Sequence, residues 1–222
     1  MIKSALVLLS GGQDSTTCLY WARQRFDPIV AVSIWYGQRH AIEIESAKKI
    51  AGLAGAKRYQ VSTDILRDIG DSALLSAGNI SSQHRSSADL PASFVPGRNL
   101  LFLTIAAALA YKWGIQDIVT GVCNTDYSGY PDCRDNTIKS LQVTLSLGMD
   151  HPFAIHTPLM RLTKAESVKL AQSLPGCMDA LVWSHTCYEG DYPPCGQCPA
   201  CKLRAKGFEE AGVQDPIYRR EG

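Results

Sequence analysis

The stretch that most constrains the fold is the junction of an apolar run with a glycine-rich turn near the start of the chain. Residues 5–9 read Ala-Leu-Val-Leu-Leu, which is typical of a strand buried on both faces. Residues 10–15 read Ser-Gly-Gly-Gln-Asp-Ser, and the paired glycines let the backbone turn tightly and approach an anion without an intervening Cβ. The loop hydroxyls, Thr16 and the free N–H groups of a helix beginning near Asp14 suit an oxygen-rich anion. This junction predicts a nucleotide as substrate.

The turn lacks the Gly-Lys-Ser/Thr of a Walker P-loop, so the loop itself offers no lysine to the β- and γ-phosphates. Its pattern instead resembles the PP-loop of the ATP pyrophosphatases, which holds the β,γ-pyrophosphate while an acceptor oxygen attacks the α-phosphorus. That resemblance implies adenylation with release of AMP and pyrophosphate. The alternative is a Ser/Gly turn that only caps a helix; the strand before it and the Asp14-Ser15 pair after it favour the phosphate interpretation.

Composition narrows the class of protein. With 222 residues, 45% hydrophobic and 19% charged, the chain fits one globular α/β domain with a small appendage. A net charge of +1 provides no broad cationic field, so we expect small-molecule partners and no nucleic acid. No stretch approaches the ~20 apolar residues of a transmembrane helix, and the short apolar start lacks a full signal-peptide core. We therefore expect no membrane contact and a cytoplasmic location.

Apolar runs alternate with helical periodicity along most of the chain. Strands are expected at 5–9, 29–36, 58–61, 117–121 and 153–156, and helices at 16–25, 44–54, 100–113, 136–147 and 163–174. This alternation predicts a doubly wound, mostly parallel α/β sheet, whose ligands collect at the carboxyl ends of the strands. Residues 66–96 show no sustained period and are expected to form a long loop, with a short helix within it as an alternative. We expect a catalytic domain over 1–180 and a smaller module over 181–222.

Four of the eight cysteines crowd near the end of the chain, at Cys187, Cys195, Cys198 and Cys201. Without a secretion signal a disulfide framework is not expected, which leaves metal binding or catalysis. Four thiolates suit tetrahedral zinc in a structural role, because they leave no open coordination position. An iron–sulfur cluster is the main alternative, and the absence of another redox signature favours zinc.

The segment after this cluster is predicted to be helical. Lys202, Arg204 and Lys206 are expected to lie along it as a solvated face, and contact of the zinc module with tRNA is the alternative.

Three further polar segments, at 35–40, 94–99 and 124–134, each follow a strand or precede a helix and are expected to converge on one crevice. They include Tyr-Gly-Gln-Arg-His at 36–40 and Tyr-Ser-Gly-Tyr-Pro-Asp-Cys-Arg at 127–134. Together with the PP-loop, the Thr-Pro-Leu and Thr-Lys-Ala-Glu segments at 157–166 and the four-cysteine tail, they closely resemble the 7-cyano-7-deazaguanine synthase family of the queuosine pathway. The resemblance spans Leu6 to about Arg204.

The resemblance implies a Rossmann-like topology of the adenine nucleotide α-hydrolase type with a small zinc module, a homodimer, and ATP with Mg2+ as cosubstrate. The implied reaction converts 7-carboxy-7-deazaguanine and ammonia to the 7-nitrile through an adenylated acid and an adenylated amide. It places the nucleotide at Leu8, Leu9, Ser10, Gly11, Gly12, Gln13, Asp14, Ser15, Thr16, Thr17 and Cys18, and one zinc ion at the four clustered cysteines.

Catalytic candidates are Asp14, Arg98 and His40. Arg98 can neutralise phosphates or the substrate carboxylate, and His40 can free ammonia from ammonium, although a capping or core histidine is an equal alternative. The role of Asp14 beside a triphosphate stays open between metal binding and capping of N–H groups.

Substrate-binding candidates supply carboxylates for the guanine-like N–H edge, rings for stacking and polar side chains for orientation. They are Tyr36, Gln38, Arg39, Arg98, Asn99, Asp126, Tyr127, Tyr130, Asp132 and Arg134. For the tyrosines, a position in the rim or core of the domain is the alternative.

Two other functions compete. A tRNA thiolase or lysidine-forming enzyme would also adenylate its substrate, but it should show a basic surface or an added RNA-binding domain, which this sequence lacks. A non-catalytic zinc-ribbon adaptor that senses ATP would bind nucleotide without releasing pyrophosphate.

Overall fold

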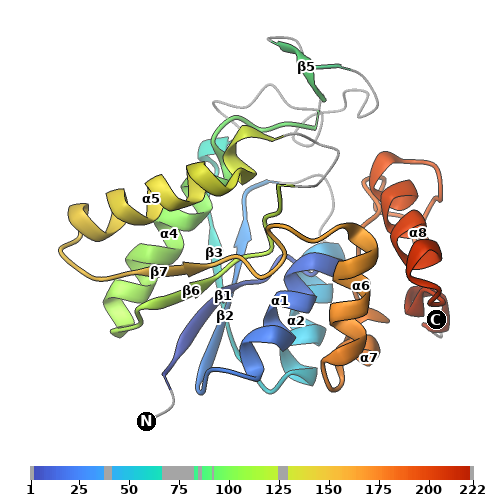
Figure 1. Cartoon of the computed structure of the whole chain (residues 1–222), viewed down its shortest axis with the longest axis horizontal. Coiled ribbons are helices and arrows are strands. Elements are labelled where there is room, and N and C mark those ends of the chain that lie inside the picture. Colours follow the sequence, from blue (N-terminus) through green and yellow to red (C-terminus); the bar gives the residue numbers. More distant parts are fainter. Residues whose placement is uncertain are drawn as a thin grey trace.

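A five-stranded parallel sheet forms the centre of the computed structural model (Figure 1), which describes residues 3–37, 42–66, 83–84, 87–91, 93–124 and 130–220. Its strands are β1 (Ala5–Leu8), β2 (Ile29–Trp35), β3 (Lys57–Ser62), β6 (Asp117–Val119) and β7 (Ala154–His156). They are ordered β3-β2-β1-β6-β7, and each neighbouring pair is parallel. The predicted doubly wound α/β class is confirmed.

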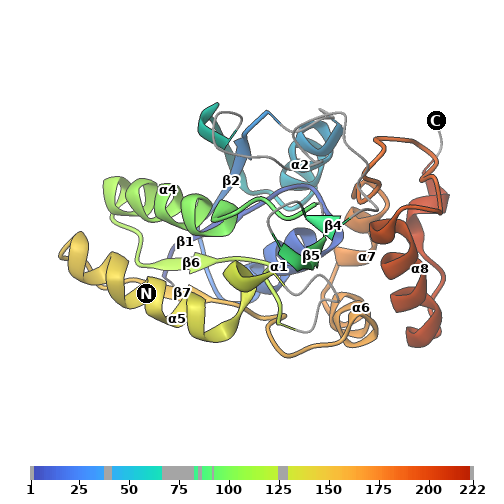
Figure 2. The ribbon, with the colours of Figure 1, turned by 90° about the horizontal axis from the view of Figure 1, so that it is seen from above.

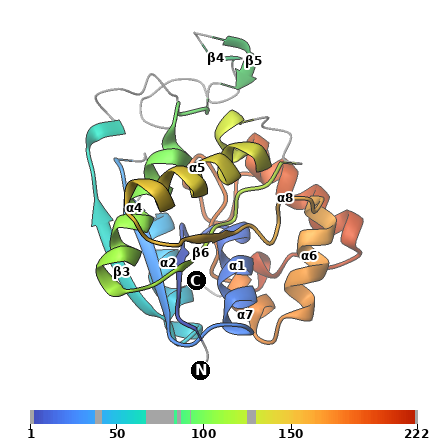
Figure 3. The same ribbon diagram turned by 60° about the vertical axis from the view of Figure 1, so that its left-hand side comes forward.

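Helices cover both faces of the sheet. They are α1 (Gln13–Arg23), α2 (Ile42–Leu53), α4 (Arg98–Trp113), α5 (Asp135–Gly148), α6 (Lys164–Ser173) and α7 (Cys177–Leu181). Figure 3 shows α4 and α5 on one face and α1, α6 and α7 on the other.

The apolar sequence of β1 follows from its position at the centre of the sheet, where helices cover both of its faces. Ala5 and Val7 pack into the core beneath α1, α2, α6 and α7, whereas Leu6 and Leu8 face the core beneath α4. A strand with both faces covered reads as a continuous apolar run rather than as an alternation. The apolar run at residues 5–9 therefore predicts a strand in the middle of the sheet.

The last part of the chain lies outside the sheet. Helix α8 (Pro199–Ala211) packs along α6, and a short 3-10 helix, η2 (Pro216–Arg219), follows it (Figure 2). A Cβ added to Gly207 would lie 2.9 Å from the Cβ of Lys164, so the two helices approach closely. The division into a catalytic domain over 1–180 and a smaller module over 181–222 stays a proposal.

Several elements differ from the sequence prediction. Helix α1 begins at Gln13 rather than at residue 16, so the loop before it is shorter and its last residues already belong to the helix. The expected long loop contains a short antiparallel pair, β4 (Gln83–His84) and β5 (Ser87–Pro91), and α7 is a helix that was not expected from the sequence. A 3-10 turn, η1 (Pro131–Cys133), precedes α5.

The connectivity places a switch point at the centre of the sheet. The chain moves outward from β1 to β2 and β3, then crosses to β6 on the other side of β1. Loops after β1 and β6 therefore diverge and leave a crevice at the carboxyl ends of these strands, where ligands bind in this class of sheet.

Within the described part of the chain, no helix combines the length and the apolar composition needed to cross a membrane.

Candidate functional site

A cavity of about 360 Å³ opens at this switch point. The PP-loop lines it, together with the first turn of α2, the start of α4, the segment after β6 and the segment 185–188 that leads into the cysteine cluster. Tyr36, Arg98, Asn99 and Tyr130 from the three predicted polar segments all reach it. Each of the three segments thus contributes at least one described residue to the cavity, as predicted.

The PP-loop is shaped by its own hydroxyls and by a glycine that no other residue can replace without strain. Gly11 has φ +92°, and a Cβ there would lie 2.3 Å from the backbone oxygen of Glu43 in α2. The Ser15 hydroxyl lies 3.0 Å from that of Ser10 and donates to the Gly12 oxygen at 3.1 Å. Gly12 caps α1 without a side-chain hydrogen bond, so the first N–H groups of the helix remain available to an anion.

Asp14 forms an ion pair with a lysine from a distant part of the chain. Lys164 Nζ donates to Asp14 Oδ2 at 2.5 Å, and Lys164 also lines the cavity. The other oxygen, Asp14 Oδ1, and both polar atoms of the Gln13 amide are buried without a hydrogen-bond partner among the described residues. Unpaired buried polar atoms beside an anion loop indicate that a ligand completes their hydrogen bonding.

Lys164 owes its position to a capping box at the start of α6. Glu166 N–H donates to Thr163 Oγ1 at 3.2 Å, and Thr163 N–H donates to Glu166 Oε2 at 2.8 Å. This fixes the first residue of the helix, Lys164, toward the PP-loop. On the other side, a Cβ at Gly121 would lie 3.1 Å from the Ser15 backbone nitrogen, so the segment after β6 also presses against the loop.

Arg98 is the first residue of α4, and its guanidinium group lies close to the hydroxyl groups of several tyrosines. Burial on its own would lower the pKa of this guanidinium, but Tyr36, Tyr130, Tyr188 and Asp132 raise it above its usual value. Burial in turn raises the pKa of each of these tyrosines, although Arg98 lowers it in part. Arg98 is therefore a permanent cation that lines the cavity beside three tyrosines and the Asp132 carboxylate.

The two described tyrosine candidates already have aromatic neighbours. The ring of Tyr36 lies 5.2 Å from that of Phe102, and the ring of Tyr130 lies 5.5 Å from that of Phe94. Tyr130 also shares a 2.6 Å hydrogen bond with Ser93. Both rings thus line the cavity as parts of packed pairs.

Two other substrate candidates have structural contacts instead. Asp132 Oδ2 accepts the Asn99 backbone N–H at 2.9 Å and so caps the start of α4, and Asp132 does not line the cavity. Arg134 occupies the cap position of α5 and does not line it either. Gln38, Arg39, His40, Asp126 and Tyr127 lie outside the described residues.

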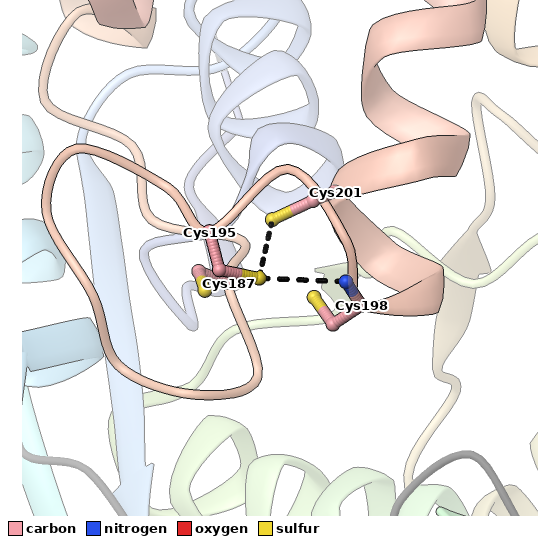
Figure 4. Close-up of side chains that lie close together, drawn as sticks. All are labelled: Cys187, Cys195, Cys198 and Cys201. Carbon is pink, nitrogen blue, oxygen red and sulfur yellow. Dashed lines mark hydrogen bonds between the residues drawn. The ribbon is translucent and has the colours of Figure 1, made fainter.

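The four cysteines of the tail form one cluster (Figure 4). The sulfurs of Cys187, Cys195, Cys198 and Cys201 lie within 4.8 Å of one another, and those of Cys195 and Cys201 are 3.9 Å apart. A tetrahedral zinc site with Zn–S bonds of about 2.3 Å places its sulfurs about 3.8 Å apart, so the geometry fits. Backbone N–H groups of Cys198 and Gln197 point at the Cys195 sulfur and lower its pKa to about 7, which favours the thiolate that a metal needs.

The cluster is joined to the PP-loop. His185 N–H donates to the Gly11 backbone oxygen at 2.9 Å, and its ring bonds the Cys187 oxygen at 2.9 Å. Arg204 braces this segment from α8, because its guanidinium donates to Ser184 at 2.8 Å and to both carboxylate oxygens of Asp215 at 2.6 and 2.8 Å. The predicted solvated face is thus wrong for Arg204, which is 2% exposed, and right for Lys202 and Lys206.

Some residues that line the cavity are not predictable from the sequence. Glu43, His185 and Tyr188 line the cavity but belong to no local motif that would reveal them, and the only sequence signal for Lys164 is the family segment at 157–166. Burial raises the pKa of Glu43 to about 7, against the opposing effect of Arg98. Such a perturbed carboxyl group in a cavity is a signal that only the structure provides.

Comparisons with known proteins identify the family and related folds. Residues 4–212 match the family model described as queuosine biosynthesis protein QueC. A 7-cyano-7-deazaguanine synthase of Chromobacterium violaceum is 57% identical over 221 residues, which cover 98% of this chain and 94% of that protein. Among solved structures, an NMN synthetase of Francisella tularensis matches with a TM-score of 0.52 at 15% identity, over 98% of this chain and 82% of that one. A 4-thiouridine synthetase in complex with RNA and ATP matches with a TM-score of 0.54 at 17% identity, over 95% of this chain and 50% of that one. These two structural likenesses concern the fold alone.

Proposed function

Because this chain belongs to the queuosine biosynthesis protein QueC family, we propose that its cavity makes 7-cyano-7-deazaguanine from 7-carboxy-7-deazaguanine, ammonium and ATP. The chain is accordingly an ATP-dependent carbon–nitrogen ligase of queuosine precursor biosynthesis. The observation that carries the proposal is the PP-loop at the carboxyl end of β1, whose open N–H groups share one cavity with Arg98 and Lys164. An anion loop without its own lysine suits pyrophosphate as a leaving group.

The chemistry needs the same activation twice. A carboxylate oxygen is a poor leaving group, so it first attacks the α-phosphorus of ATP and releases pyrophosphate. Ammonia then displaces AMP from the acyl-adenylate and gives the amide. The amide oxygen attacks a second ATP, and loss of AMP with two protons from nitrogen leaves the nitrile. One cavity can carry out both rounds, because each begins with the same attack on the α-phosphorus.

The described side chains suggest a division of labour. The N–H groups at the start of α1 bind the pyrophosphate, and Lys164 brings the cation that the loop lacks. Arg98 holds the substrate carboxylate or the α-phosphate through its planar fork. Asp14 Oδ1 suits Mg2+, a metal that prefers oxygen ligands and, when bound, offsets the repulsion between phosphates.

The cysteine cluster is proposed to hold one structural zinc ion. Four sulfur ligands in the observed arrangement leave no position for a reacting group, so the metal would fold the tail rather than act on substrate. Its link through His185 to Gly11 makes the cluster a support of the PP-loop.

We keep a cytoplasmic location and the absence of nucleic-acid partners as proposals, supported by the small substrates and by the net charge of +1. A homodimer is proposed from the family resemblance. Light scattering on the purified protein should then give twice the chain mass of 24.2 kDa, and a single-chain mass at micromolar concentration would contradict it.

The decisive assay incubates the purified protein with ATP, ammonium and the deazaguanine acid and measures each product. Two AMP and two pyrophosphate per nitrile are expected. Release of ADP and orthophosphate would overturn the adenylation chemistry. Pyrophosphate release that required tRNA would favour a tRNA-modifying enzyme, and no release at all would favour an ATP-sensing adaptor.

A further inference from the structure

Glu43 stands where the PP-loop meets the first turn of α2. Its backbone oxygen is the nearest atom to the position that a Cβ on Gly11 would occupy, at 2.3 Å, and the residue lines the cavity together with Arg98 and the loop. This neighbourhood includes the loop that releases pyrophosphate and therefore lies close to the proposed acyl-adenylate.

Among the described residues, the Glu43 carboxylate takes part in no hydrogen bond and no ion pair. Asp14, the other described acidic residue that lines the cavity, is instead paired with Lys164. The charged or titratable groups that face Glu43 are Arg98 from α4, Tyr36 after β2 and Tyr188 from the segment before the cysteine cluster. Burial raises its pKa to about 7, although Arg98 acts in the opposite direction. A carboxyl group so placed can both attract a cation and accept a proton near neutral pH.

We propose that Glu43 binds the ammonium ion and accepts its proton, so that ammonia is released beside the acyl-adenylate. This inference rests on the proposed function, and it assigns the base of the amide-forming step to a residue that no sequence motif indicates.

Amide formation begins with the transfer of a proton from ammonium to Glu43. Glu43 then passes this proton to solvent through the open side of the cavity. The nitrogen lone pair of ammonia then forms the C–N bond, and the positively charged adduct loses a second proton to the regenerated Glu43 carboxylate. The C–O bond to the nucleotide breaks, and AMP leaves with that electron pair. The amide and AMP remain in the cavity for the second round.

The test compares Glu43→Gln with Glu45→Gln, a matched change at an exposed position of the same helix. Three rates are measured at pH 7.5: acid-dependent exchange between ATP and pyrophosphate, amide formation with ammonium, and hydroxamate formation with hydroxylamine. The rate of exchange between ATP and pyrophosphate measures the adenylation step alone. Hydroxylamine is uncharged at this pH and does not need a base before it attacks.

We expect Glu43→Gln to lower kcat/KM for ammonium about 100-fold, within the usual range for a general base. Exchange and hydroxamate formation should stay within about threefold of wild type, and Glu45→Gln should leave all three rates intact. Absence of exchange in the wild-type protein would refute the proposed function itself.

The inference about Glu43 fails separately under three results. One is an ammonium dependence that does not change in Glu43→Gln. Another is loss of exchange, or a higher KM for the deazaguanine acid, which would make Glu43 a binding residue for ATP or the purine. The third is a selective ammonium defect in His40→Gln instead, which would assign the base to His40.

Discussion

The ion pair between Asp14 and Lys164 explains how a carboxylate can stand beside a triphosphate. Asp14 sits in the first turn of α1, where its charge is favourable to the helix but would repel phosphate oxygens. Lys164 neutralises it and presents a cation on the same side of the loop. Both side chains are largely buried, at 25% and 14% exposure, so the pair is weakly screened by solvent.

Lys164→Met should therefore weaken nucleotide binding and leave Asp14 uncompensated. We expect the KM for ATP in acid-dependent pyrophosphate exchange to rise by about 10- to 100-fold, the range expected for one charge-assisted contact. Lys169→Met on the exposed side of α6 is the matched control. A KM for ATP equal to wild type in Lys164→Met would remove Lys164 from the phosphate site.

Glu43 should make stability fall with pH. Its carboxyl has a pKa of about 7 in the folded protein against 4.5 for an ordinary glutamate, so the folded state binds more protons between these values. The free energy of unfolding then decreases as pH rises through this window, and the cost of placing this charge in the cavity is complete above pH 7.

We accordingly expect Glu43→Gln to gain stability relative to wild type by about 1–3 kcal/mol more at pH 8 than at pH 5. Urea unfolding at the two pH values measures this difference. Glu45→Gln should show no such pH-dependent gain, because its side chain is exposed. A constant offset between the Glu43 variant and wild type would show that Glu43 keeps an ordinary pKa.

At the scale of elements, α8 acts on the nucleotide site through the segment that it braces. Arg204 joins α8 to Asp215 on one side and to Ser184 and Thr186 on the other. His185, which lies between Ser184 and Thr186 in the sequence, donates its backbone N–H to the Gly11 oxygen. Helical geometry also explains why Arg204 differs from its neighbours, because residues 202 and 206 share a face while residue 204 points to the opposite side.

Arg204→Met should lower the free energy of unfolding by about 3–5 kcal/mol, because it leaves the Asp215 carboxylate buried without its partner. Lys202→Met, an exposed change in the same helix, should have little effect. Urea denaturation compares the two variants. Equal stabilities would mean that solvent or a neighbouring group fully replaces the guanidinium.

The whole molecule shows which features a sequence can reveal. The parallel sheet was predictable because its central strands β1 and β2 are compact apolar runs and because strands alternate with helices along the chain. The PP-loop and the cysteine cluster were predictable because the residues that form each of them are close in sequence. The pairing of Asp14 with Lys164 joins residues 150 positions apart. The environment of Glu43 likewise depends on residues from distant segments, namely Gly11 of the PP-loop and Arg98 of α4. Such features arise only from tertiary packing, so local patterns do not contain them.

The contact between the tail and the PP-loop predicts that loss of the cysteine cluster also disturbs the nucleotide site. Residues 187–201 have little core of their own, and a metal bound by four thiolates would supply much of their folding free energy. Loss of the metal should loosen the segment that reaches Gly11 through His185 and thereby disturb the PP-loop.

Cys198→Ser should therefore lower zinc content, thermal stability and ATP–pyrophosphate exchange in parallel. The matched control is Cys133→Ser, which changes a cysteine that lines the cavity but lies outside the cluster and should keep one zinc per chain. Elemental analysis and thermal unfolding measure the first two quantities. Full zinc content in Cys198→Ser would remove Cys198 from the ligand set. Loss of zinc with unchanged exchange would show that the PP-loop holds its shape without the tail, because the hydroxyl contacts of Ser10 and Ser15 and the close fit of Gly11 against α2 would then suffice.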